Sequence, residues 1–133
     1  MSEAERVEPF WLDLNDILTV HERQLSEHGG GSDIRDRNLL ESALSRPINS
    51  WHYGDPDAAA LAADYAFGIA RNHAFVDGNK RTAWVAARLF LRMNGRQLKF
   101  VQEDAIRMVL ALAAGNLAEN ELADWFRQRI VAD

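Results

Sequence analysis

The sequence predicts an all-α protein, a single domain of about six helices over residues 1–133, and three observations lead to this class. Apolar residues recur mostly at helical spacing, and helix start and stop signals divide the pattern into segments. With 133 residues and 47% hydrophobic content, the chain is large enough for one core, and no linker or low-complexity stretch divides it. Gln97 to Val101 could be extended, but this stretch is too short to imply a sheet.

The predicted helices follow one another with short connections. The first two are expected at about Leu14 to Glu27 and Arg37 to Ser45, followed by the longest non-helical stretch, the Pro47 to Pro56 loop. The others are expected at about Asp57 to Asn72, Lys80 to Met93, Gln102 to Ala114 and Ala118 to Val131.

Composition limits the possible functions. The chain has no Cys, which excludes disulfides and thiolate chemistry and suits a reducing compartment. The first residues are polar and acidic, unlike a signal peptide, and no apolar run approaches the ~20 residues of a membrane span. We therefore expect a cytoplasmic protein without a membrane partner. The net charge of −5 argues against direct, nonspecific nucleic-acid binding.

The most informative stretch runs from His73 to Thr82, between two predicted helices. The helix before it is rich in Ala and Leu and should be buried, and it should end near His73. Asp77-Gly78-Asn79 then breaks the pattern, because Gly permits positive φ and Asp and Asn are good N-caps. A second helix should follow and stop at Asn94-Gly95.

These residues suit phosphate chemistry. A helix start exposes N–H groups without intrahelical partners at the positive end of its dipole, and Lys80 and Arg81 add two cations there. Asp77 is a hard oxygen ligand suited to Mg²⁺. His73, with an ordinary pKa near ~6.5, could accept the proton of an attacking hydroxyl. Phe75 between them could anchor the loop in the core.

Each piece also has an ordinary structural interpretation. A His at a helix end is more often a cap, and Asp-Gly-Asn is more often a plain turn. Lys and Arg in a first helical turn are usually solvated, although they oppose the dipole at a cost of roughly 0.3 to 1 kcal/mol unless an anion is present. The combination favours the phosphate site over these alternatives.

The run resembles the signature of the Fic/Doc superfamily, His-x-Phe-x-Asp/Glu-Gly-Asn-Gly-Arg-x-x-Arg in adenylylating Fic proteins. Lys80 stands in place of the second Gly and Trp84 in place of the last Arg. Both differences resemble the Doc (death-on-curing) branch, whose Asn-Lys-Arg-Thr-Ala matches residues 79–83 letter for letter, whereas Gly78 is the Fic-like choice. The similarity extends over about Trp11 to Ile130 and implies the compact Fic/Doc-type helical bundle.

For function, the resemblance implies a toxin of a toxin–antitoxin pair that uses ATP and Mg²⁺. Doc proteins act as kinases on a protein hydroxyl, with elongation factor Tu as the known target type, and so inhibit translation. His73 would be the general base and Asp77 the Mg²⁺ ligand. Nucleotide and phosphate binding would fall to Gly78, Asn79, Lys80, Arg81 and Arg71.

Other readings stay open. Arg71 is equally well explained as a helix C-terminal cation. Ile48 to Tyr53 lies where the family has a target-docking flap, although burial is the commoner fate of Trp51. Because the sequence lacks a Ser/Thr-x-x-x-Glu-Gly/Asn inhibitory stretch, restraint would come from a Phd-like antitoxin. The alternatives to a kinase are a Fic-type adenylyltransferase and a catalytically silent helical binding module.

Overall fold

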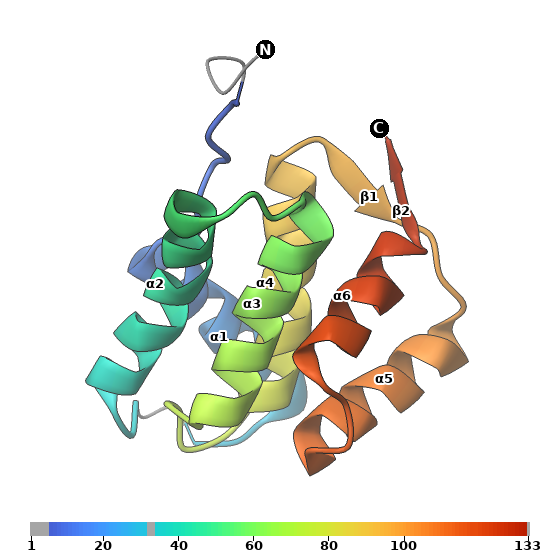
Figure 1. The fold of residues 1–133 in the computed structure, drawn as a ribbon. Helices are drawn as coiled ribbons and strands as arrows, with labels where there is room; N and C mark the ends of the chain where they lie inside the picture. The colour runs from blue at the N-terminus through green and yellow to red at the C-terminus, as the bar shows by residue number, and fades with distance from the viewer. Residues whose placement is uncertain (1–5, 32–33, 133) are drawn as a thin grey trace.

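The structure, a computed structural model, describes residues 6–31 and 34–132 and contains six helices and one small sheet within them (Figure 1). The helices are α1 (Leu14–His28), α2 (Arg37–Tyr53), α3 (Ala58–Asn72), α4 (Asn79–Met93), α5 (Gln102–Ala114) and α6 (Glu119–Arg127). The strands β1 (Arg96–Leu98) and β2 (Ile130–Ala132) are antiparallel, with Arg96 opposite Ala132 and Leu98 opposite Ile130. The predicted all-α class is confirmed.

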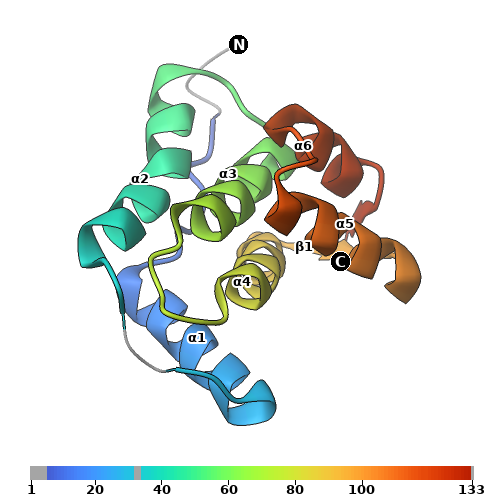
Figure 2. The same cartoon turned by 90° about the horizontal axis from the view of Figure 1, so that it is seen from below.

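Helix α3 forms the centre of the molecule and packs against α2, α4 and α6 (Figure 2). Its buried residues are mostly small, which lets the neighbouring helices approach closely. At Gly68, a Cβ atom would lie only 3.3 Å from the Cβ of Ala43 in α2. Helix α3 also contributes three large core side chains, Leu61, Tyr65 and Ile69. The surrounding elements supply the other large ones, among them Ile17, Leu40, Phe90, Leu112 and Phe126.

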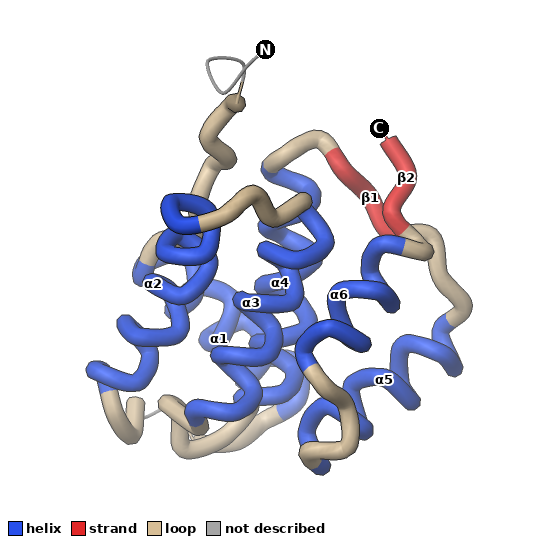
Figure 3. Tube along the Cα trace, in the orientation of Figure 1, coloured by secondary structure: helices blue, strands red, loops and turns tan. Residues whose placement is uncertain are grey.

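Two predicted helix ends were wrong. Helix α2 does not stop at Ser45 but continues through the buried Pro47 to Tyr53, so the expected Pro47 to Pro56 loop is mostly helical. Proline lacks the N–H that a helix interior uses, yet packing can override this local penalty. At the other end, α6 stops at Arg127, and Ile130 begins a strand that pairs with β1 (Figure 3). Gln97 and Leu98 of the 97–101 stretch therefore belong to a two-stranded sheet, contrary to the expectation that the stretch is too short for one, whereas residues 99–101 lie outside the strand.

The proposed docking flap lies in the last turns of α2. Trp51 is half-buried and packs edge-on against Trp11 at 6.3 Å, and the guanidinium of Arg6 lies 4.2 Å from its ring. At 1.5 Å per residue, Trp51 lies roughly 20 Å along the helix from its N-cap, Asp36. Asp36, at the N-terminal end of α2, contacts the loop that follows His73, which we call the motif loop. Because Trp51 lies at the other end of α2, its structural role is favoured over docking.

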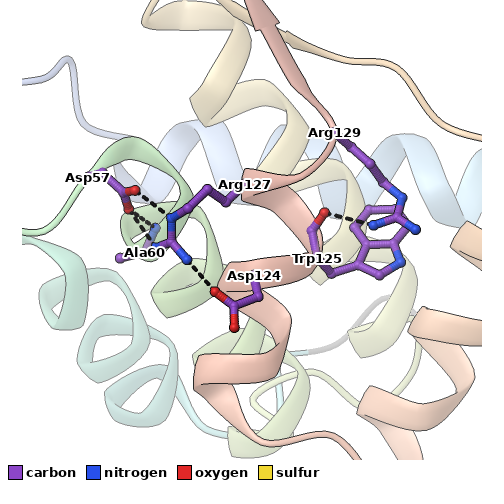
Figure 4. Close-up of polar contacts among 6 residues, drawn as sticks. All are labelled: Asp57, Ala60, Asp124, Trp125, Arg127 and Arg129. Atoms are coloured by element: carbon purple, nitrogen blue, oxygen red, sulfur yellow. Dashed lines mark hydrogen bonds and ion pairs between the residues drawn. The ribbon is translucent and has the colours of Figure 1, made fainter.

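Helices α3 and α6 are joined at the surface by an arginine fork (Figure 4). Arg127 donates two hydrogen bonds to the carboxylate of Asp57, at 2.7 and 3.0 Å, and Asp57 also caps α3 by accepting from the N–H of Ala60. The Arg127 fork lowers the pKa of Asp57. Arg129 meanwhile stacks on Trp125, 4.1 Å from the ring centre, and donates to the Trp125 carbonyl.

A second charged cluster connects three helices deeper in the protein. Arg46 of α2 is paired with Asp64 of α3, with 3.5 Å between Nε and Oδ1, and with Glu119 of α6. One cation thus faces two carboxyl groups, of which Asp64 is 6% exposed. Burial and the neighbouring Asp64 raise the pKa of Glu119 to about 7.

Within the described residues, no helix combines the length and apolar character that a membrane crossing requires.

The Glu119 cluster predicts a pH-dependent stability. The folded protein retains the Glu119 proton up to about pH 7, whereas the ordinary pKa is 4.5. The corresponding stabilisation is complete below the ordinary pKa and is lost as the pH rises through the folded value. In the wild-type protein, we expect the free energy of unfolding, measured by urea denaturation, to fall by on the order of 1 kcal/mol as the pH rises from the ordinary pKa to the folded value. In Glu119→Gln this decline should be absent. Glu22→Gln, at an exposed position, should keep the wild-type dependence of unfolding free energy on pH. The same dependence in Glu119→Gln would contradict the assignment.

Candidate functional site

His73 is the residue at which α3 ends. It is the C-cap of the helix, adopts the left-handed conformation with φ 51° and ψ 47°, and is exposed. Among the described residues other than glycine, no other has a positive φ. A left-handed residue of this kind persists only when its surroundings fix it. The packing of the following loop supplies that constraint.

The loop after His73 is anchored by Phe75, as predicted. Phe75 is 1% exposed, and its backbone forms an isolated antiparallel bridge with Ile34. The carbonyl of Ala74 accepts hydrogen bonds from the N–H groups of Arg35 and Asp36, at 2.7 and 3.0 Å. Residues 34–36, just before α2, therefore lie against the motif loop.

Asn79 closes the loop at the start of α4. Its Oδ1 accepts from the Phe75 N–H at 3.0 Å, and its Nδ2 donates to the Phe75 carbonyl at 2.9 Å. The side chain of Asn79 is thus occupied by the loop, so the predicted phosphate contact of this residue would use its backbone N–H. Gly78 precedes it with φ 82° and serves as the N-cap of α4 without a side-chain hydrogen bond. The N–H groups of the first turn have no acceptor within the helix.

Asp77 is exposed and lies beside this helix start. Its Oδ1 accepts from the N–H of Gly78 at 2.8 Å. Within the part of the chain that the structure describes, no group of three or more His, Cys, Asp or Glu residues could hold a metal ion together. A single carboxylate fits Mg²⁺, which is commonly bound by one or two carboxylates together with substrate phosphates. Asp77 therefore suits a metal that arrives with a nucleotide.

Lys80 and Arg81 are exposed at the edge of a cavity of about 560 Å³ between α4 and α5. In residues 6–31 and 34–132, neither cation forms an ion pair with a carboxylate. The cavity is mainly apolar, and two aromatic residues, Trp84 and Phe100, contribute to its wall. It can therefore accept a flat apolar group beside the two cations.

Arg88 adds a third positive charge to the cavity. Its guanidinium carbon lies 5.2 Å from the ring centre of Trp84 and 5.4 Å from that of Phe100, so the cation contacts both aromatic rings. Burial, together with the nearby Arg92, lowers the pKa of Arg88. The wall of the cavity is thus electropositive as well as aromatic.

Arg71 does not line this cavity and lies on the last turn of α3. It is exposed, and its guanidinium carbon lies 5.0 Å from the ring centre of Phe67. Phe67 is also approached by Arg46, at 5.2 Å. This position suits the helix C-terminal interpretation, and a nucleotide contact by Arg71 stays a prediction.

One further residue at this site, His21 of α1, was not predicted. Its ring is 3% exposed and stacks on Phe75, with 3.7 Å between ring centres and 10° between planes. Its Nε2 lies 2.7 Å from the carbonyl oxygen of Asp77. Because that oxygen only accepts, Nε2 is the donor. The pairing joins residues 56 positions apart.

The structure is that of a small helical protein in which a histidine and a carboxylate in one loop lie next to a helix start that carries two cations, neither of them paired with a carboxylate of the described residues. A comparison with protein families finds that residues 11–91 match the Fic/DOC family, which is more than half of the chain. The chain belongs to the Fic/DOC family.

Two curated relatives indicate the branch within the family. The chain is 44% identical to Toxin Doc of Mycolicibacterium smegmatis over 90 residues, which cover 66% of this chain and 67% of that protein. It is 31% identical to Protein kinase doc of Escherichia phage P1 over 114 residues, which cover 85% of this chain and 90% of that protein. These similarities support the Doc branch that Lys80 and Trp84 had suggested.

Thr82 generates a prediction about the motif itself. It is fully buried in α4, and its Oγ1 is a buried side-chain oxygen for which the described chain offers no hydrogen-bond partner. Thr82→Val replaces this hydroxyl with a methyl group and should leave the free energy of unfolding unchanged or raise it by up to about 1 kcal/mol in urea denaturation. The exposed Thr19→Val is the matched control. A loss above about 1 kcal/mol would mean that the hydroxyl is hydrogen-bonded in solution.

Proposed function

We propose that this protein is a Doc-type toxin that transfers the γ-phosphate of ATP to a Ser or Thr hydroxyl of a protein target. The observation that carries the proposal is the uncapped start of α4, where Lys80 and Arg81 lack carboxylate partners among the described residues and border an aromatic-lined cavity. The similarity to Protein kinase doc supports a kinase over a silent binding module. A base would fit between Trp84 and the apolar residues of α5, with the phosphates toward the helix start.

The proposed reaction needs few groups from the protein. The oxygen of the target hydroxyl attacks the γ-phosphorus, and His73 accepts the hydroxyl proton. The bond between the γ-phosphorus and the β–γ bridging oxygen breaks, so that ADP leaves and a phosphoester remains on the target. Asp77 would hold Mg²⁺, which supplies charge neutralisation to the phosphates. Lys80, Arg81 and the first N–H groups of α4 would stabilise the transferred charge.

Lys80 is the proposed determinant of which phosphate reacts. In the Fic pattern a Gly at this position leaves the anion nest open, whereas a Lys side chain adds bulk and charge. We infer that this excludes one phosphate pose and presents the γ-phosphate, rather than the α-phosphate, to the nucleophile. Trp84 removes a further phosphate clamp, because the Fic pattern has an Arg at its position.

Transfer of AMP is the second candidate. Gly78 favours it, since this residue follows the Fic pattern and adopts the left-handed conformation that a glycine provides at low cost. The two reactions would use the same histidine and the same helix start. They differ in the mass that is added to the target.

The biological setting is proposed on the same basis. Elongation factor Tu is the first target to test, and its modification would inhibit translation in the cytoplasm. The toxin name of the Mycolicibacterium relative supports a toxin–antitoxin role. A Phd-like antitoxin that folds on binding would then restrain the enzyme.

The decisive experiment is to incubate the protein with Mg²⁺, ATP and elongation factor Tu, and to weigh the intact target by mass spectrometry. We expect a phosphate-sized gain that His73→Ala reduces by about 10²- to 10⁴-fold while circular dichroism shows a folded protein. His28→Ala, which removes an exposed histidine from the last turn of α1, is the matched control and should keep activity. Retained activity in a folded His73→Ala protein would exclude His73 as the base.

Lys80→Gly tests the choice between the two reactions. The substitution restores the Fic-type glycine at an exposed position, so the fold should persist. We expect the product to shift toward an AMP-sized gain, measured on the same target. If the variant is active and its product still gains only phosphate, Lys80 does not select the reacting phosphate.

A further inference from the structure

Asp77 is held from two sides by residues of α1 and of the segment that follows it. On one side, His21 donates from Nε2 to the Asp77 carbonyl at 2.7 Å and stacks on Phe75 two residues earlier. On the other side, Gly30 lies directly against the Asp77 carboxylate. A Cβ atom at Gly30 would lie 2.6 Å from Asp77 Oδ2 and 3.1 Å from Cγ.

We propose that His21 and Gly30 are positioning residues that fix the backbone and the carboxylate of Asp77 for binding the Mg²⁺ that accompanies ATP. This inference rests on the proposed function for the identity of the ligand. The placement of Asp77 itself rests only on the contacts of the free protein, so the two parts can be tested separately.

His21 acts on the backbone of the loop. Its hydrogen bond fixes the carbonyl of Asp77 and therefore the plane of the peptide that leads to Gly78. A Cβ atom at Gly78 would lie 3.5 Å from Cδ2 and Nε2 of His21, so the ring also lies under the next residue. With 3% exposure, the imidazole cannot easily exchange its carbonyl partner for water.

Gly30 acts on the side chain. The carboxylate of Asp77 occupies the space that any larger residue at position 30 would need. Its other oxygen is bound to the N–H of Gly78 at 2.8 Å. The carboxylate is therefore confined although it is exposed, and confinement lowers the entropic cost of binding a cation with one protein ligand.

The chain provides a matched pair of variants for Gly30. Both Gly29 and Gly30 have positive φ, 78° and 122°, so an alanine strains the backbone at either position. At Gly29, however, a Cβ atom meets nothing within 4 Å. A Cβ atom at Gly30 would also lie 3.2 Å from Cδ2 of Leu25. A difference between Gly30→Ala and Gly29→Ala therefore reports the contacts at position 30 and not strain alone, and the signals of Asp77 identify its share.

For His21, two substitutions separate the hydrogen bond from the stacking. His21→Phe keeps a flat ring against Phe75 but has no donor. His21→Gln loses the ring and keeps an N–H at similar reach. Recovery of wild-type behaviour by Gln and not by Phe would identify the hydrogen bond as the positioning contact.

The first measurement uses the free protein, by NMR. We expect Gly30→Ala to shift the side-chain carboxyl carbon signal of Asp77 and the amide signal of Gly78, with Gly29→Ala leaving both near their wild-type positions. His21→Phe should speed hydrogen exchange at the Gly78 amide, and His21→Gln should restore slow exchange. Equal spectra for the two glycine variants, together with unchanged exchange in His21→Phe, would overturn the inference. Should the buried His21 variants not fold, the glycine pair alone decides it.

The second measurement is calorimetric titration with ATP, with Mg²⁺ or with a chelator. We expect Gly30→Ala and His21→Phe to weaken binding about 10-fold in Mg²⁺ and little in chelator, because misplacing a ligand acts only through the metal. An equal loss in both conditions would overturn the metal-positioning role. If the wild-type protein binds no ATP, the proposed function fails, and the NMR result still decides whether His21 and Gly30 position Asp77.

Discussion

The close packing of α3 is the constraint on which the rest of the structure depends. Ten of its fifteen residues are buried, and six of these ten are alanine or glycine, so three helices pack closely against it. The contact between Gly68 and Ala43 shows how little room is left. A helix enclosed in this way cannot tilt or slide without disrupting the core, and its C-cap residue, His73, is therefore held at a fixed position on the surface.

In the loop after α3 and the first turn of α4, some residues support the loop and others are exposed for the proposed chemistry. Phe75 is held by Ile34, just before α2, and by His21 of α1. Asn79 in turn is hydrogen-bonded through its side chain to the backbone of Phe75. His73, Asp77 and Lys80, the residues expected to contact a nucleotide or target, are exposed. Because a rigid support is tied to distant parts of the chain, the exposed groups can be preorganised although they lie on a loop.

Sequence patterns predicted the helices well wherever local signals and tertiary packing agreed. The ends of α4 follow from Gly78 and Asn94, and the predicted bounds of α5 are those that the structure shows. Packing overrode local signals at Pro47, which lies inside α2, and beyond Arg127, where pairing with β1 favours a strand. The sequence motif was enough to predict the exposed site residues because they lie close together in the sequence. It could not name His21, whose partners lie more than fifty positions away.

Trp84 shows that the difference from the Fic pattern is not confined to the phosphate site. Its ring lies parallel to Phe126, at 6.5 Å, and edge-on to Phe100 and Trp125, so it joins α4 to the C-terminal part of the fold. An arginine there would leave this aromatic contact unfilled and bring a charge into a half-buried position. Lys80, by contrast, is exposed and has no such packing role. The two departures from the Fic pattern are therefore unequal: position 84 is tied to the architecture of the domain, and position 80 is free to determine chemistry.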